Sequence, residues 1–232
     1  MQSQIKGLIY FYFTNMRHSM IIFWSILLAT VILSFVASYL LRDTDGVMMV
    51  TLTAPIYVYF SIYGYIVVKN WLPFMIKLGA TRKNIFLSFA LYFTVLTALF
   101  SVMALLIQVI LTPVARKLNL EIFSFVHLAQ FLDNAWYERL FIDIILSIFL
   151  FVTSFFIGIV NYRYGLLISS SLAGLLFLFV MLAMFYGWLG DFFIYIYKHF
   201  DFFLFVKLGL ISIIIYGITW LFLRKATIIK VR

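Results

Sequence analysis

Cysteine is absent from the 232 residues, which excludes disulfides, zinc–thiolate sites and a cysteine nucleophile. Charge is also scarce: charged residues make up 11% of the chain, whereas an ordinary soluble domain carries about 25%. Hydrophobic residues make up 66%. A chain of this size cannot hide so much apolar surface in water, because roughly a third of the surface of a small domain's chain stays exposed on folding. Lipid must therefore be its solvent.

Six hydrophobic runs are long enough to cross a membrane as helices. A spanning helix needs about 20 predominantly apolar residues. A closed barrel would need strands of about 10 residues with alternating polarity, and the sequence shows no such pattern. We therefore predict an all-α integral membrane protein with a single transmembrane domain, residues 1–232. The predicted spans are 19–40, 47–68, 85–111, 140–160, 165–187 and 206–223.

Acidic residues are missing from one side of this topology. If the N-terminus is inside, eleven cations and no acid fall on the inner side, whereas six cations and all eight acids fall on the outer side. Because basic loops mark the cytoplasmic side, both termini are predicted to be cytoplasmic. Topology and attraction to anionic lipid then account for the net charge of +9, so nucleic acid is not an expected partner. The inner cations are Lys6, Arg17, Lys69, Lys77, Arg82, Lys83, Arg163, Arg224, Lys225, Lys230 and Arg232.

The N-terminal residues 1–18 show apolar side chains at helical spacing and polar ones on another side. We expect no secretory signal here, since the apolar run that follows is too long and lacks a cleavage site. We interpret the segment as an amphipathic helix in the inner membrane interface. The alternative is that it extends the first span into the cytosol. The apolar side holds Ile5, Leu8, Ile9, Tyr12, Phe13 and Met16, and the polar side Lys6, Gly7, Thr14 and Arg17.

Two longer segments are predicted on the outer side. Residues 112–139 form the longest loop, and Pro113 is expected to end the third span. Residues 188–205 are aromatic with scattered charge and are predicted to be interfacial or re-entrant, because Trp and Tyr prefer the headgroup zone. Within the first segment, steps of three and four residues predict a short surface helix. Its apolar positions are Leu118, Ile122, Phe125, Ala129 and Leu132.

The stretch KLGATRKNIF, residues 77–86, places three cations between two apolar runs. Before it, Pro73 is predicted to open a short helix that Gly79 ends. Thr81 is the predicted N-cap of the third span. The two cations after it oppose the dipole of that span, at a cost of a few tenths of a kcal/mol each. Topology alone explains cations in this loop, but their costly position favours a turn that a cytosolic partner grips.

This stretch resembles the cytoplasmic coupling segment of bacterial ABC exporter permeases. In many of them a Leu-Gly-Ala-Thr/Ser-Arg-Lys/Arg phrase joins a short coupling helix to the next span. The whole chain is similar to the type 2 (ABC-2-like) plan, with an amphipathic N-terminal helix, six spans, an aromatic re-entrant segment before the last span and a basic tail, here LRKATIIKVR. Macrolide-exporter and cell-division permeases carry a similar phrase, but they have four spans and a large outer domain, which this chain lacks.

The resemblance implies that the coupling segment, residues 71–84, docks in a groove of a separate ABC ATPase. The chain has no Gly-x-x-x-x-Gly-Lys-Ser/Thr phosphate loop, so it is not expected to be an enzyme, and ATP and Mg would be bound by the partner. The resemblance also implies a second permease copy, identical or not, in the plasma membrane of a Gram-positive bacterium. The implied coupling residues are Pro73, Phe74, Lys77, Leu78, Gly79, Ala80, Thr81, Arg82 and Lys83.

Four polar residues in the spans are candidate groups of a transport path. An ionisable residue inside a span is a functional candidate by default, although snorkelling or a mutual Asp143–Lys207 ion pair is the alternative here. The amides, with the serines at 169–171, alternatively hydrogen-bond neighbouring helices. The three histidines fall far apart in the topology, so no metal site is predicted. The four candidates are Asp143, Gln108, Asn161 and Lys207.

The spans offer few polar groups, which disfavours a path for sugars or ions. The predicted cargo is a hydrophobic or amphipathic peptide, such as an antimicrobial peptide, toxin or lantibiotic, or a lipid-like drug. Two other functions stay open. One is the substrate-binding membrane subunit of an energy-coupling-factor importer, which favours a polar pocket built from outer loops. The other is a non-transporting immunity or sensor protein.

Overall fold

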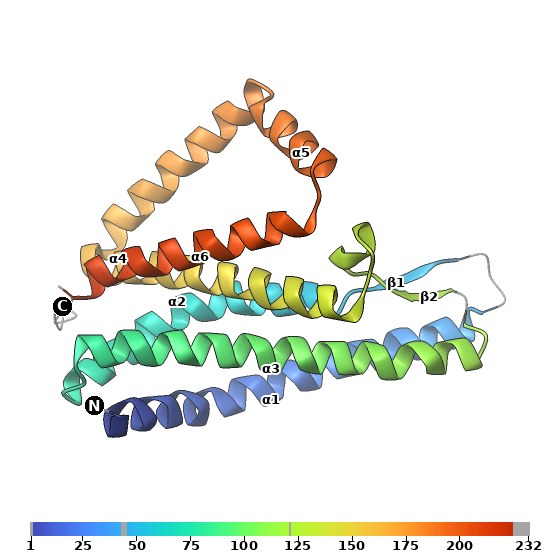
Figure 1. The fold of residues 1–232 in the computed structure, drawn as a ribbon, viewed down its shortest axis with the longest axis horizontal. Coiled ribbons are helices and arrows are strands. Elements are labelled where there is room, and N and C mark those ends of the chain that lie inside the picture. The colour runs from blue at the N-terminus through green and yellow to red at the C-terminus, as the bar shows by residue number, and fades with distance from the viewer. Residues whose placement is uncertain (1, 43–45, 121, 225–232) are drawn as a thin grey trace. The chain divides into compact units, whose positions relative to one another are not determined.

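A computed structural model describes residues 2–42, 46–120 and 122–224, and it is predominantly helical (Figure 1). The basic tail 225–232 and the predicted outer acids Asp43, Asp45 and Glu121 lie outside the described residues. The elements are α1 Gln2–Leu40, β1 Met48–Val50, α2 Thr53–Lys77, α3 Arg82–Lys117, β2 Phe123–Phe125, the 3-10 helix η1 Leu128–Phe131, α4 Trp136–Phe185, α5 Trp188–Lys198 and α6 Phe202–Leu223.

Four of the described helices are long and apolar enough to cross a membrane, namely α1, α3, α4 and α6. The predicted helical membrane class is thereby confirmed, while six crossings and cytoplasmic termini stay predictions. Helix α4 covers the predicted fourth and fifth spans in 50 residues, with a non-helical kink at Gly165 (φ 83°, ψ 174°) in place of a loop. A glycine there has no Cβ to oppose the positive φ.

The chain forms two compact units. One unit comprises Met1–Tyr59 and Leu87–Ser147, and the other comprises Phe60–Phe86 and Ile148–Arg232. Helices α2, α3 and α4 therefore each contribute to both units. The two strands and the predicted outer loop 112–139 belong to the first unit, whereas the basic stretch 77–83 and the predicted outer segment 188–205 belong to the second.

In the first unit, α1 and α3 run side by side and in the same direction (Figure 1). Tyr12 is fully buried, stacks on Phe89 with ring centroids 4.7 Å apart and shares a 2.9 Å hydrogen bond with Ser88. One helical turn later, the Tyr92 hydroxyl lies 2.8 Å from the sulfur of Met16. The N-terminal third of α1 is thus packed on the beginning of α3.

This packing revises the interpretation of residues 1–18. The predicted apolar and polar sides of this helical segment are confirmed, since Leu8, Tyr12 and Met16 are buried and the predicted polar residues are exposed. A separate interfacial helix is wrong, because α1 continues without a break from Gln2 to Leu40. At 1.5 Å per residue it is about 58 Å long, nearly twice the hydrocarbon thickness of a bilayer. This continuity favours the alternative, in which the segment extends the first span.

The loops of the first unit contain a small parallel sheet that the sequence did not predict. Strand β1 pairs with β2 in the register Met48 with Phe123, Met49 with Ser124 and Val50 with Phe125. The α2–α3 hairpin is the crossover that a parallel pair needs. Helices α1 and α3 run in the same direction, and the chain turns back after each of them into a strand (Figure 1). The two strands therefore also run in the same direction.

The predicted surface helix within residues 112–139 is replaced by this strand and by η1. Pro113 does not end α3, which continues for one more turn to Lys117. Because proline lacks a backbone N–H, it removes one hydrogen bond of the helix, and it does so close to the helix end. Asn119 then adopts φ 52° and stops helical propagation. Phe123 and Phe125 are buried and Ser124 is exposed, so burial alternates with the period of two that is typical of a strand. Neighbouring apolar residues at helical spacing hid this alternation in the sequence.

In the second unit, α2 and α4 approach at backbone distance through glycines. A Cβ on Gly158 would lie 3.0 Å from the side chain of Val68, and Gly64 faces the backbone of Phe151 and Phe155. Small residues at such crossings are typical of helices packed in lipid. Helix α6 contacts α4, where Tyr216 stacks on Phe155, and the beginning of α3, where Tyr216 stacks on Phe86 and donates a 2.5 Å hydrogen bond to its carbonyl.

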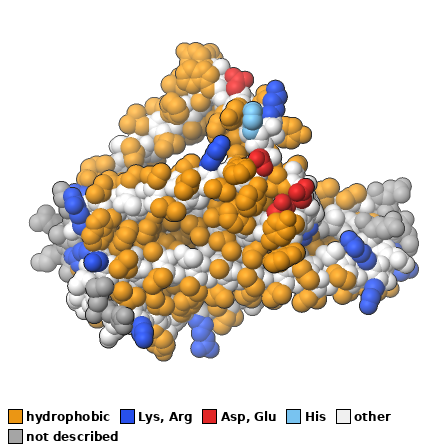
Figure 2. All heavy atoms as spheres, in the orientation of Figure 1, with side chains coloured by type: hydrophobic (Ala, Val, Ile, Leu, Met, Phe, Trp, Pro, Cys, Tyr) orange, Lys and Arg blue, Asp and Glu red, His pale blue; other side chains and the backbone are white. Residues whose placement is uncertain are grey.

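Beyond the kink, the second half of α4 runs away from α6, and α5 returns the chain to it (Figure 1). Nearly every side chain from 165 to 199 is exposed, including Leu167 at 84%. The predicted aromatic segment 188–205 holds α5, and α6 begins at Phe202, whose N–H bonds to the Asp201 carboxylate at 2.6 Å. Hydrophobic side chains cover most of the visible surface of the molecule (Figure 2), as expected for a lipid-facing protein.

Candidate functional site

The basic turn, residues 77–83, joins α2 to α3. The N–H of Gly79 bonds to the carbonyl of Ile76 at 3.1 Å, and the N–H of Ala80 bonds to that of Met75 at 3.1 Å. With Gly79 at φ 78°, these two bonds form a Schellman motif, which closes a helix and satisfies its last carbonyls. The predicted helix stop at Gly79 is confirmed, but the helix that it ends is α2 rather than a separate short helix.

The third span begins almost at once after this stop. The Thr81 hydroxyl accepts the N–H of Asn84 at 3.3 Å, and the Thr81 carbonyl accepts that of Ile85 at 3.0 Å. Thr81 is therefore the N-cap of α3, as predicted. Because a capped helix follows a closed one after only four residues, the basic turn is a stiff connection between two long helices.

The separate short helix that Pro73 was predicted to open does not exist. Pro73 lies inside α2, which continues to Lys77. Leu72 and Met75 are fully buried, and their packing offsets the one backbone hydrogen bond that proline removes. The coupling segment 71–84 is accordingly the last turns of α2, the basic turn and the first turn of α3.

The exposed surface of the basic turn combines charge with one apolar side chain. Lys77, Thr81 and Lys83 are exposed, and Arg82 is partly exposed. Leu78 is 66% exposed. Phe74, one turn earlier on α2, is 45% exposed. Ala80 is buried at 5%, so it serves the packing of the turn and does not contribute to its surface.

The end of α3 repeats this geometry at the opposite end of that helix. Asn119, at φ 52°, takes the place of Gly79, and the N–H of Leu120 bonds to the carbonyl of Ala115 at 3.0 Å. Lys117 and Leu118 correspond to Lys77 and Leu78, and both are exposed. This second turn continues into a loop and β2 rather than into a capped helix, so it is a natural control for the basic turn.

A second constellation lies in the first unit, where the loop elements bring three chain segments together. Strand β1 leads into the first turn of α2, and β2 leads through η1 into α4. Because β1 and β2 are paired, Tyr57 on α2, His127 before η1 and Asp143 on α4 converge. The sequence separations are 86 residues between Tyr57 and Asp143 and 16 between His127 and Asp143.

One carboxylate oxygen joins these three residues. The Tyr57 hydroxyl donates to Asp143 Oδ1 at 2.5 Å, and His127 Nε2 lies 3.0 Å from the same oxygen. The backbone N–H of Ala129 donates to His127 Nδ1 at 2.9 Å, so Nδ1 carries no proton and the ring is the neutral tautomer that donates from Nε2. Asp143 and His127 are 3% and 2% exposed. Asp143 is therefore held in the protein interior rather than snorkelling to water.

Gln108 and Asn161, two of the other predicted path residues, make structural contacts. Gln108, 2% exposed, accepts a 2.8 Å hydrogen bond from the Arg139 guanidinium. Asn161 donates to the Tyr65 hydroxyl and accepts from Ser169 at 3.0 Å, across the kink of α4. These amides thus bond neighbouring segments, which was the alternative interpretation. Lys207 lies in the second turn of α6 and is exposed, and the partners of Asp143 are the tyrosine and the histidine.

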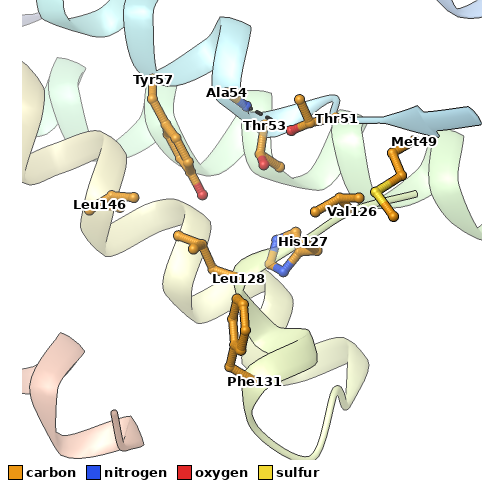
Figure 3. A pocket seen from close by; sticks show the side chains of 10 residues that line it. All are labelled: Met49, Thr51, Thr53, Ala54, Tyr57, Val126, His127, Leu128, Phe131 and Leu146. Atoms are coloured by element: carbon orange, nitrogen blue, oxygen red, sulfur yellow. Dashed lines mark hydrogen bonds between the residues drawn. The ribbon is translucent and has the colours of Figure 1, made fainter. Parts of the chain in front are cut away.

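A pocket of about 430 Å³ opens beside the His127–Asp143 pair (Figure 3). Thr53, Tyr57 and His127 form its polar part, and Thr51 lies at its edge, where its hydroxyl accepts the N–H of Ala54 at 3.3 Å. The volume falls in the range of sites for small ligands, about 300–1,000 Å³. The remaining lining is apolar: Met49, Ala54, Val126, Leu128, Phe131 and Leu146.

Sequence reasoning missed Tyr57 and His127. Three histidines spread over the topology gave no local signal, and one tyrosine among fifteen is not distinctive. The only available clue was Asp143, a carboxylate one turn into a predicted span, which requires a partner in a low-dielectric environment. Finding that partner requires the β1–β2 pairing, which sets the long-range contact.

No protein-family model, curated protein or solved structure matches this chain. Its family therefore stays a prediction, which rests on the resemblance of residues 77–86 and of the predicted six-span plan.

Proposed function

We propose that the chain is the membrane-spanning permease subunit of an ATP-driven ABC exporter of the type 2 kind, powered by a separate ATPase. The observation that carries the proposal is the basic turn. A Schellman-closed helix and a Thr-capped helix flank it within four residues, so a force applied to the turn moves both helices. An ATPase that closes on nucleotide needs such a rigid point of attachment.

The surface of the basic turn also supports a protein partner. Leu78 and Phe74 are large apolar side chains exposed at 66% and 45%, next to exposed Lys77 and Lys83. An apolar anchor surrounded by charge is the composition of a docking surface, in which the buried anchor contributes affinity and the charges orient the partner. The cargo proposed is a hydrophobic or amphipathic peptide or drug, because the described spans are almost entirely apolar.

Co-purification tests the proposal. The chain is expressed from its native gene neighbourhood with a tag, and nucleotide-binding proteins that co-purify are identified. Leu78→Asp and Lys77→Glu are expected to reduce recovery of an ATPase at least about tenfold, because each removes a contact of the anchor or its charged border. The matched controls, Leu118→Asp and Lys117→Glu, change the equivalent residues of the turn after α3 and should leave recovery unchanged.

The pocket beside His127 favours a second candidate, the substrate-binding membrane subunit of an energy-coupling-factor importer. Such a subunit would need the outer-loop pocket and would not rely on the basic turn. Its partners would be recovered equally with Leu78→Asp and with Leu118→Asp. A chain that purifies alone in every variant would favour the immunity or sensor interpretation and would contradict both transport functions.

A further inference from the structure

The floor of the pocket contains a chain of hydrogen bonds that all point toward Asp143. Tyr57 has one hydroxyl proton, and it is donated to Asp143 Oδ1. Thr53 also hydrogen-bonds to Tyr57, and since the phenolic proton is already used, Thr53 must be the donor in that bond. Both hydroxyl protons are therefore directed inward, and the Thr53 oxygen, which donates its proton, can accept a hydrogen bond from a ligand.

The group behind this floor that accepts the Tyr57 hydrogen bond is the Asp143 carboxylate. His127 is neutral, because its Nδ1 accepts the Ala129 N–H, so Asp143 is bound by two neutral donors. The positive charge of Arg139 also interacts with Asp143, but Arg139 does not line the pocket, and its guanidinium donates hydrogen bonds to Asn134 at 2.9 Å and Gln108 at 2.8 Å. The described lining includes no cation. A positively charged donor that enters the pocket would thus meet acceptor oxygens backed by a carboxylate.

The rest of the pocket lining is apolar and therefore favours a ligand whose uncharged part is hydrophobic. Met49 on β1 and Phe131 on η1, exposed at 69% and 66%, flank the opening, and Leu146 and Val126 line the wall (Figure 3). A volume of about 430 Å³ accommodates one aromatic or branched side chain with an amine, and not a whole peptide.

We propose that this pocket binds a hydrophobic ammonium group, either a small amphipathic amine or a cationic anchor residue of a peptide. This inference adds a ligand class to the proposed function. Only the identification of the ligand as transported cargo rests on that proposed function. The binding site itself is defined by Thr53, Tyr57 and Asp143 and exists whether or not an ATPase binds the chain.

The absence of cysteine allows a direct binding assay. Met49→Cys places a single thiol at the rim, and the full chain is reconstituted in phosphatidylcholine nanodiscs and labelled with a maleimide. The probes are 4-phenylbutylamine and its uncharged analogue 4-phenylbutanol. The amine is expected to slow labelling at concentrations at least about tenfold lower than the alcohol, the ratio for one charge-assisted hydrogen bond. In the same reporter chain, Asp143→Asn should abolish this preference.

Leu167→Cys is the matched control, an 84% exposed apolar position in the other unit. Labelling of this control thiol measures how far each probe slows the reaction merely by entering the bilayer, without binding to the pocket. Three results would each overturn the proposal: equal potency of amine and alcohol at the rim thiol, a preference retained by Asp143→Asn, or equal protection of the rim thiol and the control thiol. If the asparagine variant does not fold, Thr53→Val, which removes one pocket oxygen, takes its place and should weaken the preference. No ATPase is present, so failure of the exporter proposal leaves this result unaffected.

Discussion

Gly64 on α2 lies directly against the backbone carbonyl of Phe151 on α4. A Cβ at this position would overlap the carbonyl oxygen and would also approach Phe155 N to 3.0 Å and Ser154 Cβ to 3.1 Å. The two helices of the second unit are therefore in contact through their backbones, and the space between them is too small for any side chain at residue 64.

Gly64→Ala is expected to destabilise the protein by about 1–3 kcal/mol, the usual cost of overpacking. The atoms that it meets belong to the backbone, so no rotamer change relieves the overlap. Thermal unfolding in detergent measures the effect. Gly174→Ala, in the exposed half of α4 where an added Cβ meets nothing within 4 Å, is the control and should match or slightly exceed wild-type stability. Equal stability of the two variants would show that α2 and α4 are not in backbone contact.

Gly79→Ala should destabilise the basic turn for a different reason. An added Cβ meets nothing within 4 Å, but φ is +78°, where a Cβ costs about 1–2 kcal/mol. Gly79→Asn should cost less, since asparagine tolerates this conformation and already occupies the equivalent position 119. Thermal unfolding and ATPase recovery are measured together. If alanine and asparagine at 79 behave alike in both measurements, the turn does not depend on its left-handed residue.

Tyr57→Phe is expected to cost about 1.5–3 kcal/mol of unfolding free energy, because it removes a hydrogen bond to a buried carboxylate. A double-mutant cycle with Asp143→Asn should give a coupling energy of at least about 1 kcal/mol, which would identify the pair rather than either residue alone. Tyr197→Phe, at a 76% exposed tyrosine, is the control for loss of a phenol and should be neutral. Additive effects of the two changes would contradict the observed bond.

The local signals of the sequence predicted the turn between α2 and α3 correctly. Gly79 and Thr81 act through hydrogen bonds to residues within five positions, so their roles are visible in the sequence. The buried face of residues 1–18 was equally readable, because helical periodicity fixes which side chains share a side. Periodicity does not show where a helix ends if tertiary packing extends the helix past a proline. For this reason Pro73 and Pro113 were predicted at helix ends, although both lie inside helices.

The pocket could not be predicted because it depends on pairing between distant segments. The β1–β2 register brings together residues 48–50 and 123–125, and both strands are only three residues long, too short for a clear alternating pattern. Without that register nothing places His127 near Asp143. The sequence identified the buried carboxylate, and the fold supplied its partners.

The packing of α1 on α3 gives a prediction that separates a continuous first helix from an interfacial one. With p-azidophenylalanine in place of Tyr12, illumination should cross-link α1 to α3, because the tip of the Tyr12 side chain lies 2.9 Å from Ser88 and needs no access to water to react there. The same photoreactive residue in place of Thr14 is the control, since Thr14 is exposed on another side of the same helix. Both variants are read by the mobility shift of protease fragments cut between α1 and α3. Equal cross-linking, or none with residue 12, would mean that the N-terminal segment leaves α3 and lies along the membrane, as the amphipathic pattern alone suggested.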